Sequence, residues 1–255
     1  MATRRRKADR QAQIVVELGI RPALRVHELA ERLDVSVETI RRDLTEMDRR
    51  GELNRTFGGA VRSLMFEPGL AERAELLVPE RERIAAAAAQ LVEPADILMI
   101  GGGATTLHFA RRLATSAGHI TVITHSFSIA TTLAINPAIR ILMLPGEYDV
   151  REGIIYGPET IDALQRFHAS KAFLGATGLT IEGPNDASTS AGLIYGTMMQ
   201  RASNVYVLAD HSKFDRPSLT VIGSWSPLIT IVTDQAPSGQ LAAALSTKGV
   251  KTMVG

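Results

Sequence analysis

Residues 24–44 read LRVHELAERLDVSVETIRRDL, and the spacing of their apolar side chains predicts two helices joined by a tight turn. Apolar residues recur three and four positions apart on both sides of a break at residues 34–36, as one buried face of each helix requires. Ser36 directly precedes the second helix and can cap it. The pattern predicts a helix-turn-helix, whose second helix enters the major groove of DNA. The apolar positions are Val26, Leu29, Ala30, Leu33, Val37, Ile40, Leu44 and Met47.

The polar side of the second helix is the side that would meet DNA. Once Ile40 and Leu44 point inward, the polar positions of this helix lie outside the core. Periodicity alone leaves a plainer interpretation open, because any amphipathic helical hairpin shows it and an arginine pair is usually a solvated surface. On the first interpretation we predict DNA contacts from Ser36, Thr39, Arg41 and Arg42.

Two neighbouring features favour DNA binding. Residues 4–7 read RRRK and Arg10 follows, which together form a basic arm suited to phosphate contacts. Residues 51–61 read as two short strands around a glycine turn, the wing that accompanies many helix-turn-helix domains and touches the DNA backbone. Residues 1–63 hold 14 Lys and Arg against 10 Asp and Glu, a net +4, whereas the remaining residues hold 14 against 17, a net −3.

The composition describes an ordinary globular protein of two domains. At 255 residues, with 45% hydrophobic and 22% charged residues, the chain can bury a sizeable core. Cysteine is absent, which excludes disulfides and thiolate metal sites, and the six histidines show no paired metal spacing, so we expect no metal and no cofactor. We find neither a membrane-spanning apolar run nor a secretory signal, and we expect a cytoplasmic protein without membrane contact.

Beyond the wing, strands and helices alternate. Residues 62–80 read as a linker, which we place at 64–79 between a DNA-binding domain (1–63) and a second domain (80–255). Apolar strands separated by helices predict an α/β fold, a parallel sheet covered on both faces. We expect strands at 97–100, 120–124, 139–144, 172–175, 205–209, 228–232 and 250–254, and helices at 80–92, 106–113, 128–135, 158–167, 193–202 and near Leu241.

Small and polar residues collect where these strands end, and ligands of parallel sheets bind at that edge. Residues 101–106 read GGGATT and open a helix, so their backbone amides can attract an anion and their glycines allow close approach. The string matches neither the P-loop nor the Gly-x-Gly-x-x-Gly pattern, and a tight turn without a ligand is the alternative. Because several other strand ends are also polar, we favour a binding pocket.

Three strings along the chain resemble the DeoR family of bacterial repressors of sugar metabolism. They are VSVETIRRDL at 35–44, continued by Arg55 and the Gly-Gly-Ala of 58–60; GATT at 103–106; and LADHSKF at 208–214. The resemblance implies an N-terminal winged helix-turn-helix and a C-terminal sensor domain similar in fold to ribose-5-phosphate isomerase and coenzyme A transferases. It also implies a homo-oligomer, a dimer or a tetramer, that releases its operator DNA on binding a phosphorylated sugar. We add Arg55 of the wing to the predicted DNA-binding residues.

The chain departs from the family pattern beside the predicted pocket. Gly101 stands where the family typically carries an acidic residue, and Tyr195 and Gly196 stand where it typically carries a Lys-Arg pair. The effector here can therefore be a different acid, a larger sugar or an unphosphorylated one. Tyr195, His108 and His125 can supply neutral hydrogen bonds, or all three are ordinary packing residues.

We predict a pocket that brings these strand ends together. Lys213 is the best remaining cation for an anionic effector, unless it only pairs with Asp210 at the surface. The predicted effector-binding residues are Gly102, Gly103, Ala104, Thr105, Thr106, Thr124, His125, Ser126, Gly175, Gly178, Tyr195, Asp210 and Lys213.

The sequence therefore predicts a regulator, a repressor of a carbohydrate catabolic operon under the control of a sugar or sugar phosphate, and not an enzyme. One alternative is a sugar-phosphate isomerase-like enzyme with an added DNA-binding domain. A second alternative is a C-terminal domain used only for oligomerisation, against which the glycine-rich loops argue weakly. Acid and base groups for the enzyme would come from Glu147, Asp186, Asp210 and Lys213.

Overall fold

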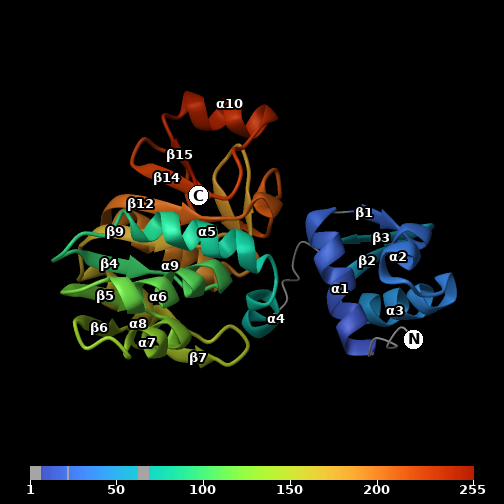
Figure 1. Cartoon of the computed structure of the whole chain (residues 1–255), viewed down its shortest axis with the longest axis horizontal. Helices are drawn as coiled ribbons and strands as arrows, with labels where there is room; N and C mark the ends of the chain where they lie inside the picture. The colour runs from blue at the N-terminus through green and yellow to red at the C-terminus, as the bar shows by residue number, and fades with distance from the viewer. Residues whose placement is uncertain (1–6, 22, 63–68) are drawn as a thin grey trace. The chain divides into compact units, whose positions relative to one another are not determined.

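The computed structural model describes residues 7–21, 23–62 and 69–255, and the chain divides into two units with separate apolar cores. The first unit covers residues 1–68 and the second covers residues 69–255. In Figure 1 the first unit is drawn in blue and the second runs from teal to red.

The first unit is a helix-turn-helix with a β-wing. Its core contains apolar side chains from all three helices, among them Ile14, Leu29 and Ile40, which are fully buried. Ser36 caps α3, because its side-chain oxygen accepts a hydrogen bond from the backbone N–H of Thr39. The predicted hairpin is confirmed as α2 Val26–Leu33 and α3 Val37–Arg49, and the predicted wing as β2 Leu53–Thr56 and β3 Gly59–Arg62. A first helix, α1 Lys7–Ile20, and a short strand, β1 Ala23–Arg25, were not predicted, and β1 joins the wing in the strand order β1-β3-β2.

Gly59 joins the wing to the rest of the first unit, because it pairs with Arg25 of β1 and with Thr56 of β2. A Cβ atom at this position would lie 2.0 Å from the backbone oxygen of Leu24, closer than such atoms can approach. We expect Gly59→Ala to lower the free energy of unfolding of this unit by about 1–3 kcal/mol, measured by thermal unfolding. Gly58→Ala is the matched control, since a Cβ there meets nothing within 4 Å, and equal losses in both variants would contradict the steric explanation.

The second unit is built on a seven-stranded parallel sheet in the order β15-β14-β12-β9-β4-β5-β6. Neighbouring residues of one strand belong to different cores: Leu98 and Ile100 of β4 lie in one apolar cluster and Met99 lies in the other. Helices α5, α6 and α7 contribute to the first cluster, and α8, α9 and α10 contribute to the second. The predicted parallel sheet with both faces covered is therefore confirmed.

The elements of this sheet and its covering helices follow one another in the predicted alternation. The strands are β4 Ile97–Ile100, β5 Ile120–Thr124, β6 Ile139–Met143, β9 Ala169–Leu174, β12 Ala202–Leu208, β14 Ile229–Thr233 and β15 Lys251–Val254. The helices are α5 Val78–Ala89, α6 Ala104–Ser116, α7 Phe127–Leu133, α8 Pro158–Gln165, α9 Thr189–Gln200 and α10 Gly239–Thr247. Helix α9 begins four residues before the predicted start, because Ser188 caps it by accepting from the backbone N–H of Ala191.

Two expectations for the second unit are wrong or incomplete. A short helix, α4 Leu70–Ala74, lies inside the range 64–79 that we expected to be a linker, and it belongs to the second unit. Residues 64–68 of that range lie outside the described residues. Two small antiparallel sheets were not predicted, because strands of two or three residues are too short to show alternation. They are β7 Glu147–Asp149 with β8 Ile154–Tyr156, and β10 Gly178–Leu179 with β11 Pro184–Asp186 and β13 Thr220–Val221.

Candidate functional site

The polar residues of α3 form an exposed surface on the first unit. The side chains of Arg41 and Arg42 are 57% and 80% exposed, and each lies near Glu38, with N···O distances of 4.0 and 3.3 Å. Ion pairs this exposed contribute little to stability, so either guanidinium can exchange its partner for a phosphate or a base. At the start of the helix, the hydroxyls of Ser36 and Thr39 lie 2.8 Å apart. Of the four predicted contact residues, Ser36, Arg41 and Arg42 are exposed and Thr39 is half-buried beside Ser36.

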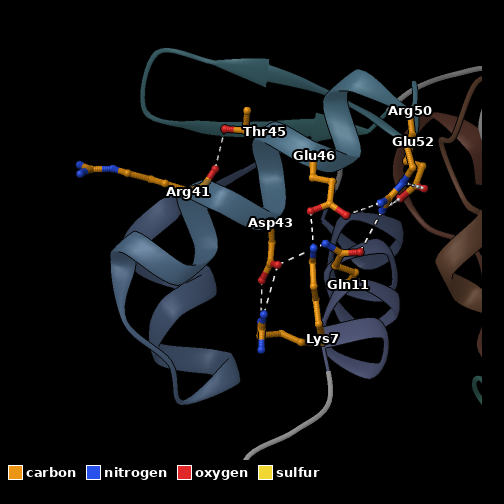
Figure 2. A network of polar contacts seen from close by, with 9 residues as sticks. Lys7, Gln11, Arg41, Asp43, Thr45, Glu46, Arg50 and Glu52 are labelled. Carbon is orange, nitrogen blue, oxygen red and sulfur yellow. Dashed lines mark hydrogen bonds and ion pairs between the residues drawn. The ribbon is translucent and has the colours of Figure 1, made fainter.

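The wing is fixed to α3 by Arg55. Its guanidinium donates a hydrogen bond to the hydroxyl of Thr45 at 2.9 Å, and its backbone N–H donates to the carboxylate of Asp48 at 2.9 Å. Thr45 in turn donates to the backbone oxygen of Arg41, as Figure 2 shows. These contacts place the predicted wing residue beside the predicted helix residues.

A network of polar contacts ties α1 to the inner side of α3 (Figure 2). Asp43 is buried and accepts two hydrogen bonds from Arg10, at 2.5 and 3.2 Å, and one from Gln11 at 3.2 Å. The Asp43 hydrogen bond is the largest cause of a raised pKa for Arg10. Arg50 donates to Gln11 and Glu46, which extends the network to the end of the helix. The network fixes the position of α3 against α1.

This network corrects one sequence prediction and adds a residue to the site. We expected Lys7 and Arg10 to contact phosphates, but Arg10 pairs with the buried Asp43. Lys7 pairs with Glu46 in an exposed ion pair, so its phosphate contact stays a prediction. Residues 4–6 of the predicted basic arm lie outside the described residues. Asp43 was not singled out, although it is three residues after the buried Ile40 and thus falls on the buried face. A carboxylate on the buried face of a helix needs a partner, and this feature of the sequence could have revealed the role of Asp43.

The strand order of the second unit defines where a ligand can bind. The chain starts the sheet at β4, adds β5 and β6 on one side, and then returns to add β9, β12, β14 and β15 on the other. The direction therefore reverses between β4 and β9, and the loops that follow these two strands leave in opposite directions. They contain Gly102 and Gly175, and a Cβ on Gly175 would lie 3.6 Å from the backbone oxygen of Gly102. The glycine loop thus lies at the position where open α/β sheets bind ligands.

Tyr195 of α9 lies against this glycine loop. Its hydroxyl donates a hydrogen bond to the backbone oxygen of Gly102 at 2.8 Å, and the side chain is buried. A Cβ on Gly101 would lie 2.8 Å from the Tyr195 ring. The acidic side chain that the family pattern places at position 101 therefore has no room beside this tyrosine. The two departures from the family pattern are sterically linked.

His125 follows β5 and lies beside both the glycine loop and Tyr195. It is fully buried, and neither ring nitrogen has a hydrogen-bond partner among the described residues. Its Nε2 would lie 3.6 Å from a Cβ on Gly102, and its ring centroid is 5.7 Å from that of Tyr195. Burial lowers the pKa of His125 to about 4, so the ring is neutral at pH 7. An uncharged donor and acceptor thus lies beside the loop.

The lowered pKa of His125 predicts a pH dependence of stability. Between about pH 4 and the ordinary value near 6.5, the unfolded chain binds a proton that the folded chain excludes, so stability falls as the pH falls through this window. The full loss contributed by this group is about 3 kcal/mol. Urea unfolding at pH 7 and pH 4.5 measures it, with His125→Asn as the comparison. If the variant loses as much stability as the unmodified chain over this range, the loss comes from other groups.

The remaining predicted residues at this edge are mostly held by local contacts. Thr124 donates to the backbone oxygen of Ile100 at 2.7 Å, Ser126 caps α7, and Thr106 donates to the backbone oxygen of Gly103 at 3.1 Å. Ala104 and Thr105 are buried in the first turn of α6. Gly178 instead lies against the backbone of Arg216. A Cβ on Gly178 would lie 1.8 Å from the carbonyl oxygen of Arg216.

Asp210 and Lys213 follow β12 at the same edge of the sheet, and both side chains are buried. Their burial excludes the surface location of the alternative, in which the two residues only pair with each other. Asp210 accepts from the backbone N–H and the hydroxyl of Ser212, and one of its oxygens lies 3.8 Å from the Nε of Arg81. Arg81 belongs to α5 and was not predicted, because its burial depends on the three-dimensional fold and not on local sequence.

Helix α4 is tied to the same edge by contacts that the sequence did not reveal. Arg73 pairs with Glu152 through two hydrogen bonds of 2.7 and 3.2 Å, and its backbone oxygen accepts from Arg81. Glu152 lies in the turn between β7 and β8, and this turn continues into Ile155, whose backbone N–H donates to the oxygen of His125. The first helix after the junction is thus connected to two of the strand ends that form the predicted pocket.

Comparison with known proteins identifies both units. Residues 10–63 match a DeoR-like helix-turn-helix domain, and residues 78–235 match a DeoR C-terminal sensor domain. The second match alone spans more than half of the chain. This chain belongs to the DeoR family.

Curated relatives resemble this DeoR family member along most of their length. The HTH-type transcriptional repressor GlcR of Bacillus subtilis is 29% identical over 87% of this chain and 86% of the relative. The transcriptional repressor AccR of Agrobacterium fabrum is 32% identical over 89% of each chain. The glycerol-3-phosphate regulon repressor of Escherichia coli is 30% identical over 82% of this chain and 84% of the relative.

Among solved structures, ribose-5-phosphate isomerase A from Methanocaldococcus jannaschii is 20% identical with a TM-score of 0.38. The match covers 52% of this chain and 53% of the isomerase chain. No helix in the described part of this DeoR family member is long and apolar enough to cross a membrane. Within the described residues, no group of three or more His, Cys, Asp or Glu side chains is arranged to hold a metal ion.

Proposed function

We propose that this chain is a DNA-binding repressor of a carbohydrate catabolic operon, controlled by a sugar or sugar-phosphate effector. The observation that carries the proposal is the exposed pair Arg41 and Arg42 on a capped helix, in a chain whose second unit matches a DeoR sensor domain. Arginines on such a surface can read guanine edges in the major groove. The relatives GlcR, AccR and the glycerol-3-phosphate regulon repressor are all named as repressors, which supports this role.

The proposed DNA-binding surface combines α3 with the wing. Arg42 is the most exposed of the two cations and is assigned to base contacts, while Arg41 and Arg55 are assigned to the phosphate backbone. The hydrogen bond from Arg55 to Thr45 supports this assignment, because it holds the wing next to the helix. Ser36 and Thr39 complete the proposed surface at the start of the helix.

The proposed effector site lies where the strand order reverses, between β4 and β9. Gly102, Gly103 and the first turn of α6 offer backbone N–H groups and a helix N-terminus to an anionic group. His125, Tyr195 and Thr105 add uncharged polar groups, which suit the hydroxyls of a sugar. The buried Lys213 is assigned to an acidic group of the effector. The full proposed set is Gly102, Gly103, Ala104, Thr105, Thr106, Thr124, His125, Ser126, Gly175, Gly178, Tyr195, Asp210 and Lys213.

The protein is proposed to act in the cytoplasm as a homo-oligomer. One winged helix reads few base pairs, and repressors gain specificity when protein symmetry pairs two half-sites. Light scattering on the full chain at micromolar concentration tests this assembly, and a monomer under operator-binding conditions would contradict it.

An enzymatic role has less support. Of the four acid and base candidates, Glu147 is exposed on the β7–β8 hairpin, where it accepts from Tyr156, whereas Asp210 is buried at the end of β12. Glu147 and Asp210 therefore differ in exposure and lie on different elements, and the named relatives are transcriptional regulators. We therefore assign no reaction to the chain.

One experiment tests the proposed function as a whole. The purified chain selects duplexes from a random pool, and fluorescence anisotropy then measures their affinity with and without a panel of sugars and sugar phosphates. We expect an enriched sequence and one compound that changes its affinity without being consumed. Failure to enrich any duplex would contradict DNA binding, and consumption of the compound, followed by chromatography, would favour the enzyme.

Lys213→Met is expected to weaken the response to that compound about ten- to a hundredfold while operator affinity stays unchanged, because a charge-assisted contact is lost. Methionine keeps most of the buried aliphatic stem, so packing changes little. Lys251→Met on the exposed edge strand β15 is the control. A normal response from the Lys213 variant would remove this residue from the effector site.

A further inference from the structure

The wing presents an apolar ring to solvent. Among the described residues of the first unit, Phe57 is the one large apolar side chain that is exposed, and its exposure is complete. Folding of this unit gains nothing from the ring, because it packs against no part of the core. The ring is therefore free to contact a ligand of the first unit.

The turn that carries Phe57 is held on both sides. Thr56 pairs with Gly59, so Phe57 and Gly58 form a two-residue connection between β2 and β3. The backbone oxygen of Gly58 accepts a hydrogen bond of 3.0 Å from the N–H of Val26, which ties the tip of the wing to the start of α2. Phe57 is thus displayed from a defined position.

The charges around the ring indicate what covers it. Arg55 lies two residues away and is fixed to α3 by Thr45, the same helix that carries the exposed Arg41 and Arg42. A Cβ on Gly58 would meet nothing within 4 Å, so no side chain blocks approach to the ring from that residue. An apolar ring next to Arg55, on a wing held against an arginine-bearing helix, suits a polyanion that also offers apolar sugar and base surfaces.

We propose that Phe57 enters the minor groove of operator DNA, where its ring packs against deoxyribose and unstacks one base step. This inference rests on the proposed function, because it requires that α3 binds the adjacent major groove. Apolar side chains that enter the minor groove act as wedges and bend the duplex toward the major groove. Phe57 thereby adds a preference for easily deformed steps, such as TA or CA, at positions that α3 does not read.

The test uses the full chain and duplexes that the unmodified chain selects from a random pool. We expect Phe57→Ala to lower affinity about tenfold, in line with the loss of an aromatic contact to a base, and Phe57→Leu to keep most of it. The dependence of affinity on salt should not change, because no phosphate contact is removed. Asn54→Ala, an exposed residue of the same wing, is the matched control and should bind normally.

Two further readouts separate the wedge from other roles. Phe57→Trp adds a second tryptophan to a chain that has one, and its emission should be quenched when the selected duplex is added. The bend of the duplex, measured by gel mobility of permuted fragments, should decrease with Phe57→Ala.

Normal affinity and bending with Phe57→Ala would overturn the inference and leave the proposed function standing. If the unmodified chain selected no duplex, the proposed function itself would fail first. Light scattering gives a third outcome. If the unmodified chain is an oligomer and the Phe57→Ala variant is a monomer, the ring makes a contact between copies of the chain, and the inference is overturned.

Discussion

Replacing Arg42 with alanine is expected to weaken operator binding about ten- to a hundredfold without lowering the melting temperature of the first unit. The side chain is 80% exposed, and its salt bridge to Glu38 is a surface pair of little energetic value. The loss should therefore be confined to the complex. Fluorescence anisotropy on the selected duplex measures the affinity, and circular dichroism measures the melting.

The same helix offers a matched control for this experiment. Arg49 is an exposed arginine in the last turn of α3, about two turns beyond Arg42. Arg49→Ala removes the same charge from the same helix and should change affinity far less. Equal losses from both variants would mean that only net charge matters, and an unchanged affinity for Arg42→Ala would contradict the assigned recognition surface.

Replacing Asp43 with alanine is expected to destabilise the first unit by about 3 kcal/mol, because one partner of a buried ion pair is removed. The value lies at the low end of the usual range, since the Arg10 side chain keeps 12% of its surface exposed while Asp43 keeps 2%. Gln11 loses a partner as well. Chemical unfolding of the full chain, followed by a probe in the first unit, measures the change.

A double substitution shows whether the loss comes from the unpaired charge. With Arg10→Met and Asp43→Leu together, no charge is left unpaired, and replacing both members of such a pair by apolar groups is often neutral. We expect this variant to recover most of the stability. If it is as unstable as Asp43→Ala, packing at this position and not the ion pair carries the energy.

The helix-turn-helix was predictable because its signals are local. The apolar spacing around Ile40 and Leu44 and the cap at Ser36 lie within one or two helical turns in the sequence. The contacts that hold α1 against α3 are not local: Arg10 and Asp43 are 33 residues apart, and nothing in the spacing links them. Lys7 and Arg10 were therefore interpreted as free basic residues.

The second unit shows the same division. The strands, the parallel sheet and the glycine loop follow from short apolar and glycine-rich strings. The contact between Tyr195 and Gly102 spans 93 residues and depends on how α9 packs over the sheet. Arg81 and Arg73 were missed for the same reason, because charged residues are normally expected at the surface and only the fold buries Arg81.

The separate cores of the two units have a calorimetric consequence. Each unit buries its own apolar side chains, so differential scanning calorimetry of the full chain should show two peaks of heat absorption. A single unfolding enthalpy would not describe both peaks. A compound stabilises only the unit to which it binds. Operator DNA should therefore shift the peak of the first unit directly, and an effector should shift that of the second. One heating scan then reports which half of the chain any new compound recognises.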